Sequence, residues 1–91
     1  MGFDVVVSEK AAKQIKKLGH RQGGLILAWL MKNIRGIEDP RSRGKALAGN
    51  MRDLWRYRVG DYRIVCDIQD NKLVVLVLSV GHRSDIYKTS G

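Results

Sequence analysis

A segment of alternating polar and apolar residues that turns back on itself, residues 54–66, constrains the fold of this chain most strongly. It reads LWRYRVGDYRIVC. Gly60 suits the first central position of a two-residue type II′ turn, so the segment predicts a β-hairpin with a fixed register. The predicted cross-strand pairs are Val59 with Tyr62, Arg58 with Arg63, and Arg56 with Val65.

The predicted hairpin has two faces of different chemistry, because side chains alternate across a strand. One face gathers Arg56, Arg58 and Arg63. The other face is apolar and is expected to join the core; it holds Trp55, Tyr57, Val59, Tyr62, Ile64 and Cys66. Like charges directly opposite each other on a sheet are destabilising, so the pair of Arg58 and Arg63 favours an anion bound over that face. The alternative is a solvated basic face whose arginine stems cover apolar surface.

The charge of the chain indicates a polyanionic partner. Its 91 residues hold 17 Lys and Arg against 9 Asp and Glu, a net charge of +8. Nucleic acid is the leading candidate, and a membrane surface ranks below it because the basic residues do not line one long amphipathic helix. The longest apolar run, 73–78, is too short to span a bilayer, and the first residues lack the layout of a signal peptide. We therefore expect a soluble, cytoplasmic protein with no membrane contact.

The first third of the chain predicts a strand and two helices. Residues 3–7 form a β-branched run typical of an edge strand, and Ser8 offers an N-cap for a helix that Gly19 ends. Apolar residues at helical spacing after the Gly23-Gly24 pair predict a second helix over about residues 25–35. The two helices are expected to form a helical hairpin.

Residues 36–53 predict an ordered basic loop of a length that often signals function, and Lys45 within it is a candidate RNA contact. Three strands follow, over residues 54–59, 62–68 and 73–80. The last has no polar face and is expected to be central and covered on both sides. The chain is thus predicted to be a single α+β domain, residues 1–91, in which an N-terminal helical hairpin packs on a small, mostly antiparallel four-stranded sheet.

The residues after the last strand suggest chemistry. His82, Arg83 and Tyr87 are expected near one end of the sheet, beside Arg63. Arginines hold a phosphate and neutralise charge that develops on its oxygens, and a histidine moves protons near neutral pH. These are the parts of a metal-free ribonuclease, in which a ribose 2′-oxygen attacks the adjacent phosphate and leaves a cyclic phosphate and a 5′-hydroxyl. The sequence has neither closely spaced carboxylates nor a phosphate-binding Gly-rich loop, so no metal and no cofactor are expected.

The chain resembles toxins of the RelE/ParE superfamily, on the RelE-like mRNA interferase side. The resemblance covers nearly the whole chain, and residues 54–63 are its most specific part. The other matching motifs are Asp39-Pro40, Gly44-Lys45-Ala46-Leu47, Ser79-Val80-Gly81-His82-Arg83 and Tyr87. The resemblance implies a RelE-like toxin of a type II toxin–antitoxin system that cleaves mRNA in the ribosomal A site. It also implies neutralisation by a cognate antitoxin encoded beside it.

The resemblance implies roles for the arginines of the hairpin. Arg56 and Arg58 would hold the mRNA backbone, and Arg63, just after the Gly-Asp turn, would stabilise the transition state. Some relatives have lysines in place of Arg56 and Arg58. A charge-neutralising role survives that exchange, whereas a role in proton transfer is less suited to arginine.

The resemblance also implies roles for three residues near the C-terminus. Arg83 matches a proposed general acid, and Tyr87 matches a proposed base or stacking residue. His82 stands where some relatives carry a lysine. Because a histidine moves protons readily, an acid-base role for His82 stays open beside those of Arg83 and Tyr87.

Two other functions are compatible with the sequence. A ParE-like inhibitor of DNA gyrase would share the fold and the basic charge without needing the catalytic set. A folded but inactive relative would bind its antitoxin and, as a complex, operator DNA. In each case we expect the antitoxin to dock through an acidic amphipathic or extended segment on exposed apolar and basic surface, at the helical hairpin and the sheet edges.

Overall fold

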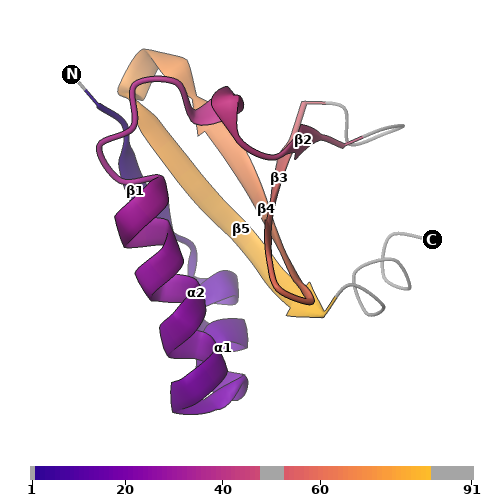
Figure 1. The fold of residues 1–91 in the computed structure, drawn as a ribbon. Coiled ribbons are helices and arrows are strands. Elements are labelled where there is room, and N and C mark those ends of the chain that lie inside the picture. Colours follow the sequence, from indigo (N-terminus) through magenta and orange to yellow (C-terminus); the bar gives the residue numbers. More distant parts are fainter. Residues whose placement is uncertain (1, 48–52, 83–91) are drawn as a thin grey trace.

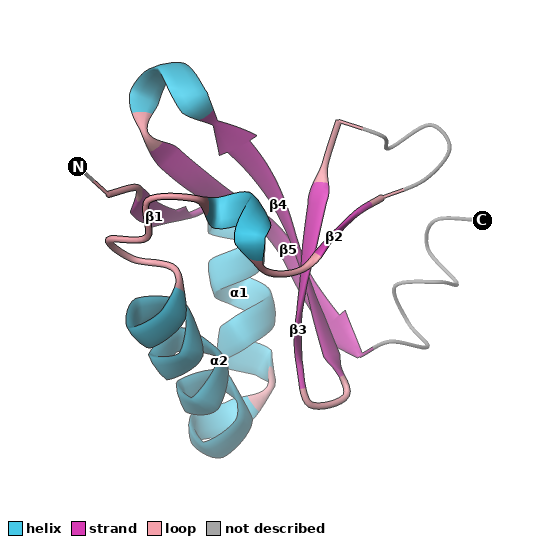
Figure 2. Ribbon diagram, turned by 45° about the horizontal axis from the view of Figure 1, so that its top comes forward, coloured by secondary structure: helices cyan, strands magenta, loops and turns pink. Residues whose placement is uncertain are grey.

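A five-stranded sheet with both helices on one side organises the molecule (Figure 1, Figure 2). The computed structural model describes residues 2–47 and 53–82. The elements are β1 (Asp4–Val7), α1 (Glu9–Lys17), α2 (Gly19–Asn33), β2 (Lys45–Ala46), β3 (Trp55–Val59), β4 (Tyr62–Gln69) and β5 (Val74–His82), with 3-10 turns at Pro40–Ser42 and Asp70–Lys72. The strand order is β1-β5-β4-β3-β2; β1 and β5 are parallel and the other neighbours antiparallel. The predicted α+β class, a helical hairpin on a mostly antiparallel sheet, is confirmed.

The β3–β4 hairpin has the predicted register. Arg58 pairs with Arg63, and Val59 pairs with Tyr62. Gly60 adopts a φ of +59°, whereas Asp61 is not among the described residues with positive φ, and this is the pattern of a type II′ turn. A local turn and a local alternation are therefore enough to predict this part of the fold.

The sheet has one strand more than expected. β2 lies inside the segment predicted to be a loop, and it pairs with β3 through Lys45 opposite Arg56 and Ala46 opposite Trp55. A strand of two residues carries no alternation that a sequence pattern could reveal. Its pairing arises because the loop folds back along β3, which is a tertiary effect.

β4, rather than β5, is the central strand of the sheet. β5 lies between β1 and β4, and its side chains alternate: Val75 and Val77 are buried, whereas Leu76 and Leu78 are half-buried. The expectation that this strand is covered on both sides is therefore wrong. β5 is apolar because it lies inside the sheet, with strands on both sides and the helices packed against one of its faces, as Figure 2 shows.

The first helix starts as predicted, and the second starts earlier. Ser8 caps α1, because its Oγ accepts a hydrogen bond of 3.1 Å from the Ala11 N–H. α2 begins at Gly19, well before the predicted start near residue 25, so only Leu18 separates the two helices. Neither described helix is long and apolar enough to cross a membrane.

The Gly23-Gly24 pair lies inside α2 rather than ahead of it. Gly23 is buried against α1, where an added Cβ would lie 2.6 Å from the carbonyl oxygen of Ile15. Glycine at this position allows the two helices to approach closely. Helix propensity disfavours glycine and does not reveal this packing role. For that reason the sequence predicts the start of the second helix too late.

One core lies between the helices and the sheet. Its buried members are Phe3, Ala11, Ile15, Ile26, Leu30, Ile34, Tyr57, Ile64, Cys66, Ile68, Val75, Val77 and Val80. The ring centroids of Trp29 and Tyr57 lie 5.6 Å apart, which joins α2 to β3. Burial raises the pKa of the Cys66 thiol to about 12. The thiol therefore stays protonated, and the prediction of Cys66 as a core residue is confirmed.

The two adjacent glycines of α2 predict opposite effects of one substitution. Gly23→Ala should destabilise the protein by about 1–3 kcal/mol, because the new methyl group would meet the Ile15 carbonyl. Gly24→Ala should stabilise it by about 0.5–1 kcal/mol, since nothing lies within 4 Å of a Cβ there. Urea unfolding of the two variants measures both changes, and equal effects would contradict the helix packing.

Candidate nucleic-acid interface

Four cationic side chains share the face of the sheet that points away from the helices. Lys45 lies opposite Arg56, and Arg58 lies opposite Arg63. Cross-strand partners project from the same face of a sheet. Tyr57, between Arg56 and Arg58 in the sequence, is buried against α2, so its two neighbours point the other way. We call Lys45, Arg56, Arg58 and Arg63 the cationic face.

Arg63 is the buried member of the cationic face. The residue is only 6% exposed. Within the part of the chain that the structure describes, its Nε and Nη1 atoms have no hydrogen-bond partner. Burying an unpaired guanidinium is costly, and the like charge of Arg58 directly opposite adds repulsion. An anion bound over this face would offset both effects.

The other members of the cationic face are open to solvent to different degrees. Lys45 and Arg58 are exposed, and Arg56 is half-buried. Arg58 Nε donates a hydrogen bond of 3.3 Å to the Gly60 carbonyl oxygen, so its side chain runs along the hairpin toward the turn. Exposed cations around a buried one suit a phosphate backbone, which they would attract from solvent and hold over Arg63.

Two aromatic side chains of β3 hold the segment that leads into β2. The Tyr57 hydroxyl donates a hydrogen bond of 2.6 Å to the Pro40 carbonyl oxygen, and the Trp55 Nε1–H donates one of 2.6 Å to the Arg43 carbonyl oxygen. Burial raises the pKa of Tyr57, so its hydroxyl stays protonated and continues to donate. The loop backbone is thereby fixed against β3.

Gly44 lets this segment approach β3 closely. It adopts a φ of +79°, and an added Cβ would lie 2.3 Å from the Arg56 carbonyl oxygen and 2.8 Å from Trp55 Nε1. Only glycine fits both the backbone conformation and the space. Because Lys45 follows directly, Gly44 determines that Lys45 comes to lie opposite Arg56.

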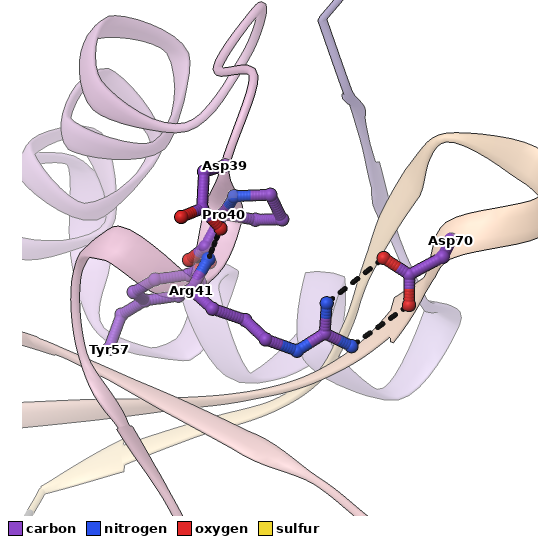
Figure 3. Close-up of polar contacts among 5 residues, drawn as sticks. All are labelled: Asp39, Pro40, Arg41, Tyr57 and Asp70. Carbon is purple, nitrogen blue, oxygen red and sulfur yellow. Dashed lines mark hydrogen bonds and ion pairs between the residues drawn. The ribbon is translucent and has the colours of Figure 1, made fainter.

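An ion pair ties the same segment to the turn between β4 and β5. Arg41 Nη1 and Nη2 each lie 2.9 Å from a carboxylate oxygen of Asp70, as Figure 3 shows. Asp39 Oδ1 accepts a hydrogen bond of 3.1 Å from the Arg41 backbone N–H and caps the short turn. The hydrogen bonds from Arg41 lower the pKa of Asp70. Both side chains are exposed, so the pair contributes little stability and mainly fixes the direction of the segment.

His82 does not share the cationic face. It pairs with Tyr62, and the two rings meet edge to face with centroids 5.7 Å apart. Arg63 pairs instead with Gly81. Because neighbouring residues of a strand point to opposite faces, His82 and Arg63 lie on opposite sides of the sheet. The expectation that they come together is wrong, while an acid-base role for His82 is untested and stays a prediction.

His82 lines a cleft of about 650 Å³ between α2 and the tip of the β3–β4 hairpin. Trp29 and Tyr62 contribute aromatic surface to this cleft, and Lys32 and Asn33 contribute polar groups. The cleft lies on the helix side of the sheet. It is therefore separate from the cationic face.

Arg83 and Tyr87 lie outside the described residues, so their predicted roles stay predictions from the sequence. Among the residues that the structure does describe, no group of three or more His, Cys, Asp and Glu side chains could hold a metal ion. The described part of the candidate site therefore consists of the cationic face alone.

Sequence reasoning missed the residues that position Lys45. Tyr57 and Trp55 were predicted as core residues, but their hydrogen bonds to carbonyls 17 and 12 residues away leave no sequence pattern. Gly44 could have been found, since a glycine within an ordered loop is the residue that most readily adopts a positive φ.

Comparison with known proteins identifies the family. Residues 5–87 match the family model of the ParE toxin of type II toxin–antitoxin systems, parDE. The chain belongs to this toxin family. The superfamily resemblance drawn from the motifs is thereby confirmed.

The ParE-family chain is 33% identical to the mRNA interferase toxin RelE of Escherichia coli K12, over 96% of this chain and 92% of the relative. The mRNA interferase RelE of Shigella flexneri matches to the same extent. The fold is similar to a chain of the toxin–antitoxin complex RelBE2 from Mycobacterium tuberculosis, with a TM-score of 0.82, 25% identity, and coverage of 93% of this chain and 95% of that one. A mutant of the E. coli toxin RelE in the free state gives a TM-score of 0.73 at 30% identity, over 97% and 93% of the two chains.

Gly44→Ala in this ParE-family toxin should separate β2 from β3, because the new Cβ meets the Arg56 carbonyl and alanine is strained at positive φ. We expect a loss of about 1–3 kcal/mol in stability and weaker RNA binding, with a smaller salt dependence as Lys45 is displaced. Gly36→Ala is the control, because Gly36 has a similar positive φ of +82°, lies in the segment after α2 rather than in the sheet, and has nothing within 4 Å of an added Cβ. RNA affinity that falls equally in both variants would contradict a special role of Gly44.

The Arg41–Asp70 pair predicts a pH dependence of stability. The pKa of Asp70 is lower in the folded than in the unfolded chain, so the pair stabilises the fold above the unfolded pKa, near 3.9, and this contribution is lost as pH falls through the folded pKa. The difference in melting temperature between the wild type and Asp70→Asn should therefore shrink below about pH 4. Asp61→Asn, at the exposed hairpin turn, serves as the control, because Asp61 forms no ion pair among the described residues.

Proposed function

We propose that this toxin is a ribosome-dependent endoribonuclease that cleaves mRNA in the ribosomal A site. The observation that carries the proposal is Arg63, a buried guanidinium with two nitrogens unpartnered among the described residues, set in a face with three further cations. Such a site is suited to bind an anion. The two relatives at 33% identity are named mRNA interferases, which supports RNA as the source of that anion.

The members of the cationic face take different parts in the proposed reaction. Lys45, Arg56 and Arg58 hold successive phosphates of the mRNA backbone, because they are the solvent-accessible cations of the face. Arg63 lies deeper and donates to the non-bridging oxygens of the scissile phosphate, where negative charge develops in the transition state. Its donors are already in place before substrate arrives, so little reorganisation is needed.

The chemical step is an attack of the ribose 2′-oxygen on the adjacent phosphorus. The bond from phosphorus to the 5′-oxygen breaks, which yields a cyclic phosphate and a 5′-hydroxyl; one proton leaves the 2′-hydroxyl and one reaches the 5′-oxygen. Arg83 as general acid and Tyr87 as base or stacking residue complete the proposal from sequence, and the scheme uses no metal or cofactor. Arg56 and Arg58 are assigned to charge neutralisation, because a guanidinium is poorly suited to proton transfer.

The proposed partners are mRNA on the ribosome and a cognate antitoxin. One structurally similar chain comes from the RelBE2 toxin–antitoxin complex, and another is a mutant RelE bound to a peptide of the antitoxin RelB. A net charge of +8 favours an acidic antitoxin that covers the basic surface, and the complex is proposed to bind operator DNA. Action on translating ribosomes implies a cytoplasmic location. A small acidic reading frame directly beside the gene would support this context.

Substitution of Arg63 tests the proposed reaction. Arg63→Ala should lower the rate of mRNA cleavage by about 100- to 1,000-fold, since it removes transition-state stabilisation. Arg35→Ala, an exposed residue just after α2, removes the same charge away from the cationic face and should cleave like the wild type. The assay incubates antitoxin-free toxin with translating ribosomes and maps mRNA 5′ ends. Absence of codon-phased cuts with the wild type would reject the proposal.

The same assay separates the two alternative functions. Breaks in DNA that depend on gyrase, with intact mRNA, would favour a ParE-like gyrase inhibitor. A growth defect that persists unchanged in Arg63→Ala and Arg83→Ala would favour a relative that acts only by binding. Neither alternative requires a transition-state role for Arg63, whose buried Nε and Nη1 have no partner among the described residues.

A further inference from the structure

The edge of β5 that faces away from β4 changes its hydrogen-bonding partner part-way along the strand. Over its first half, β5 pairs with β1, as far as Val77 opposite Val7. The chain then leaves the sheet at Ser8 and enters α1, which packs along β5 (Figure 1). The second half of β5 therefore has no strand on that side within the described chain, and its backbone groups need other partners.

The side chains of Ser8, which caps α1, and of Gln14 in α1 take over where β1 ends. The backbone N–H of Ser8 still donates to the Val77 carbonyl oxygen at 3.0 Å. One residue farther along, Ser8 Oγ donates to the Leu78 carbonyl oxygen at 3.2 Å. Beyond that, Gln14 Oε1 accepts a hydrogen bond of 2.7 Å from the Val80 N–H. Val80 is only 3% exposed, so water cannot easily replace this acceptor.

These bonds bracket a β-bulge. Val65 pairs with Ser79 and Cys66 with Val77, which leaves Leu78 as the extra residue of β5. Without the bulge, the register of Cys66 with Val77 would continue to place Val80 opposite Arg63. With the bulge, Gly81 lies opposite Arg63. The neighbour of the buried guanidinium is thus a glycine instead of a β-branched valine.

We propose that Gln14 is a positioning residue for the cationic face: by holding the Val80 N–H it keeps the bulged register that places Gly81 opposite Arg63. Gln14 itself touches neither the cationic face nor a substrate; it acts through β5. The consequence for cleavage rests on the proposed function. Lys45, Arg56 and Arg58 belong to β2 and β3, which do not pair with β5. Loss of the Gln14 hydrogen bond should therefore displace Arg63 without changing how the other three cations bind the mRNA backbone.

The test compares Gln14→Leu, which keeps the size but removes the acceptor, with Gln14→Glu, which keeps an acceptor oxygen. In Gln14→Leu the Val80 amide should exchange with solvent faster, and the Arg63 Nε–H resonance should shift, both measured by NMR. On translating ribosomes kcat should fall by about 10- to 100-fold with KM nearly unchanged, since a small displacement of Arg63 affects the transition state. Gln14→Glu should restore all three readouts toward the wild type.

The control is Ile15→Val, the neighbouring residue of α1, whose buried side chain packs in the core. It should lower the melting temperature without moving the Val80 exchange rate, the Arg63 resonance or kcat. The proposal is overturned if Gln14→Leu leaves the Val80 amide protected, if Gln14→Glu fails to rescue, or if kcat follows melting temperature equally in Gln14→Leu and Ile15→Val. A wild type that cuts no mRNA rejects the proposed function instead, and the two NMR readouts then decide the role of Gln14.

Discussion

The two-residue turn at Gly60 and Asp61 sets the register of β3 and β4, and both faces of the sheet depend on that register. With a side-chain period of two, the turn sends Tyr57, Ile64 and Cys66 into the core and Arg58 and Arg63 to the other side. A slip by one residue would exchange the two sets. The core that stabilises the fold and the cations that we assign to RNA are therefore specified by one local feature.

The cationic face is held in place from both ends of the sheet. On the β3 side, Tyr57 and Trp55 bind carbonyls of the segment before β2, and Gly44 allows Lys45 to lie against Arg56. On the β5 side, the side chains of Ser8, which caps α1, and of Gln14 in α1 bind backbone groups of β5 beyond the end of β1. Neutral hydrogen bonds at a distance from the charges thus help to fix the geometry, together with the Arg41–Asp70 ion pair. Such an arrangement is preorganised to bind an anion.

The sequence predicted those parts of the fold that local patterns determine. The hairpin register, the Ser8 cap and the α+β class follow from turn chemistry, capping and periodicity, and the structure has all three. Tertiary contacts determined the rest. β2 exists because a loop is pinned to β3, and α2 starts early because Gly23 packs on α1. The burial of Arg63 depends on packing that its alternation does not encode.

The position of His82 is a feature that no local sequence pattern predicts. Because His82 directly precedes Arg83, the sequence suggested that His82 shares a site with Arg63. The face on which a strand residue lies depends on its position in the alternation, and the bulge at Leu78 shifts that alternation in β5 by one residue. β5 is apolar from residue 74 to residue 78, so it gives no polar alternation from which that shift could be read. The side chains of α1 that hold the bulge are distant in sequence, so no local pattern announces it.

The buried charge of Arg63, whose Nε and Nη1 have no partner among the described residues, also links the stability of the fold to the toxicity of the protein. An apolar side chain of similar length at this position would remove a desolvated cation and its repulsion with Arg58, so the inactive protein would fold at least as well as the toxin. A toxin gene that loses its toxicity through such a substitution therefore still encodes a protein that folds. We expect such inactive variants to persist as stably folded proteins that still bind an antitoxin.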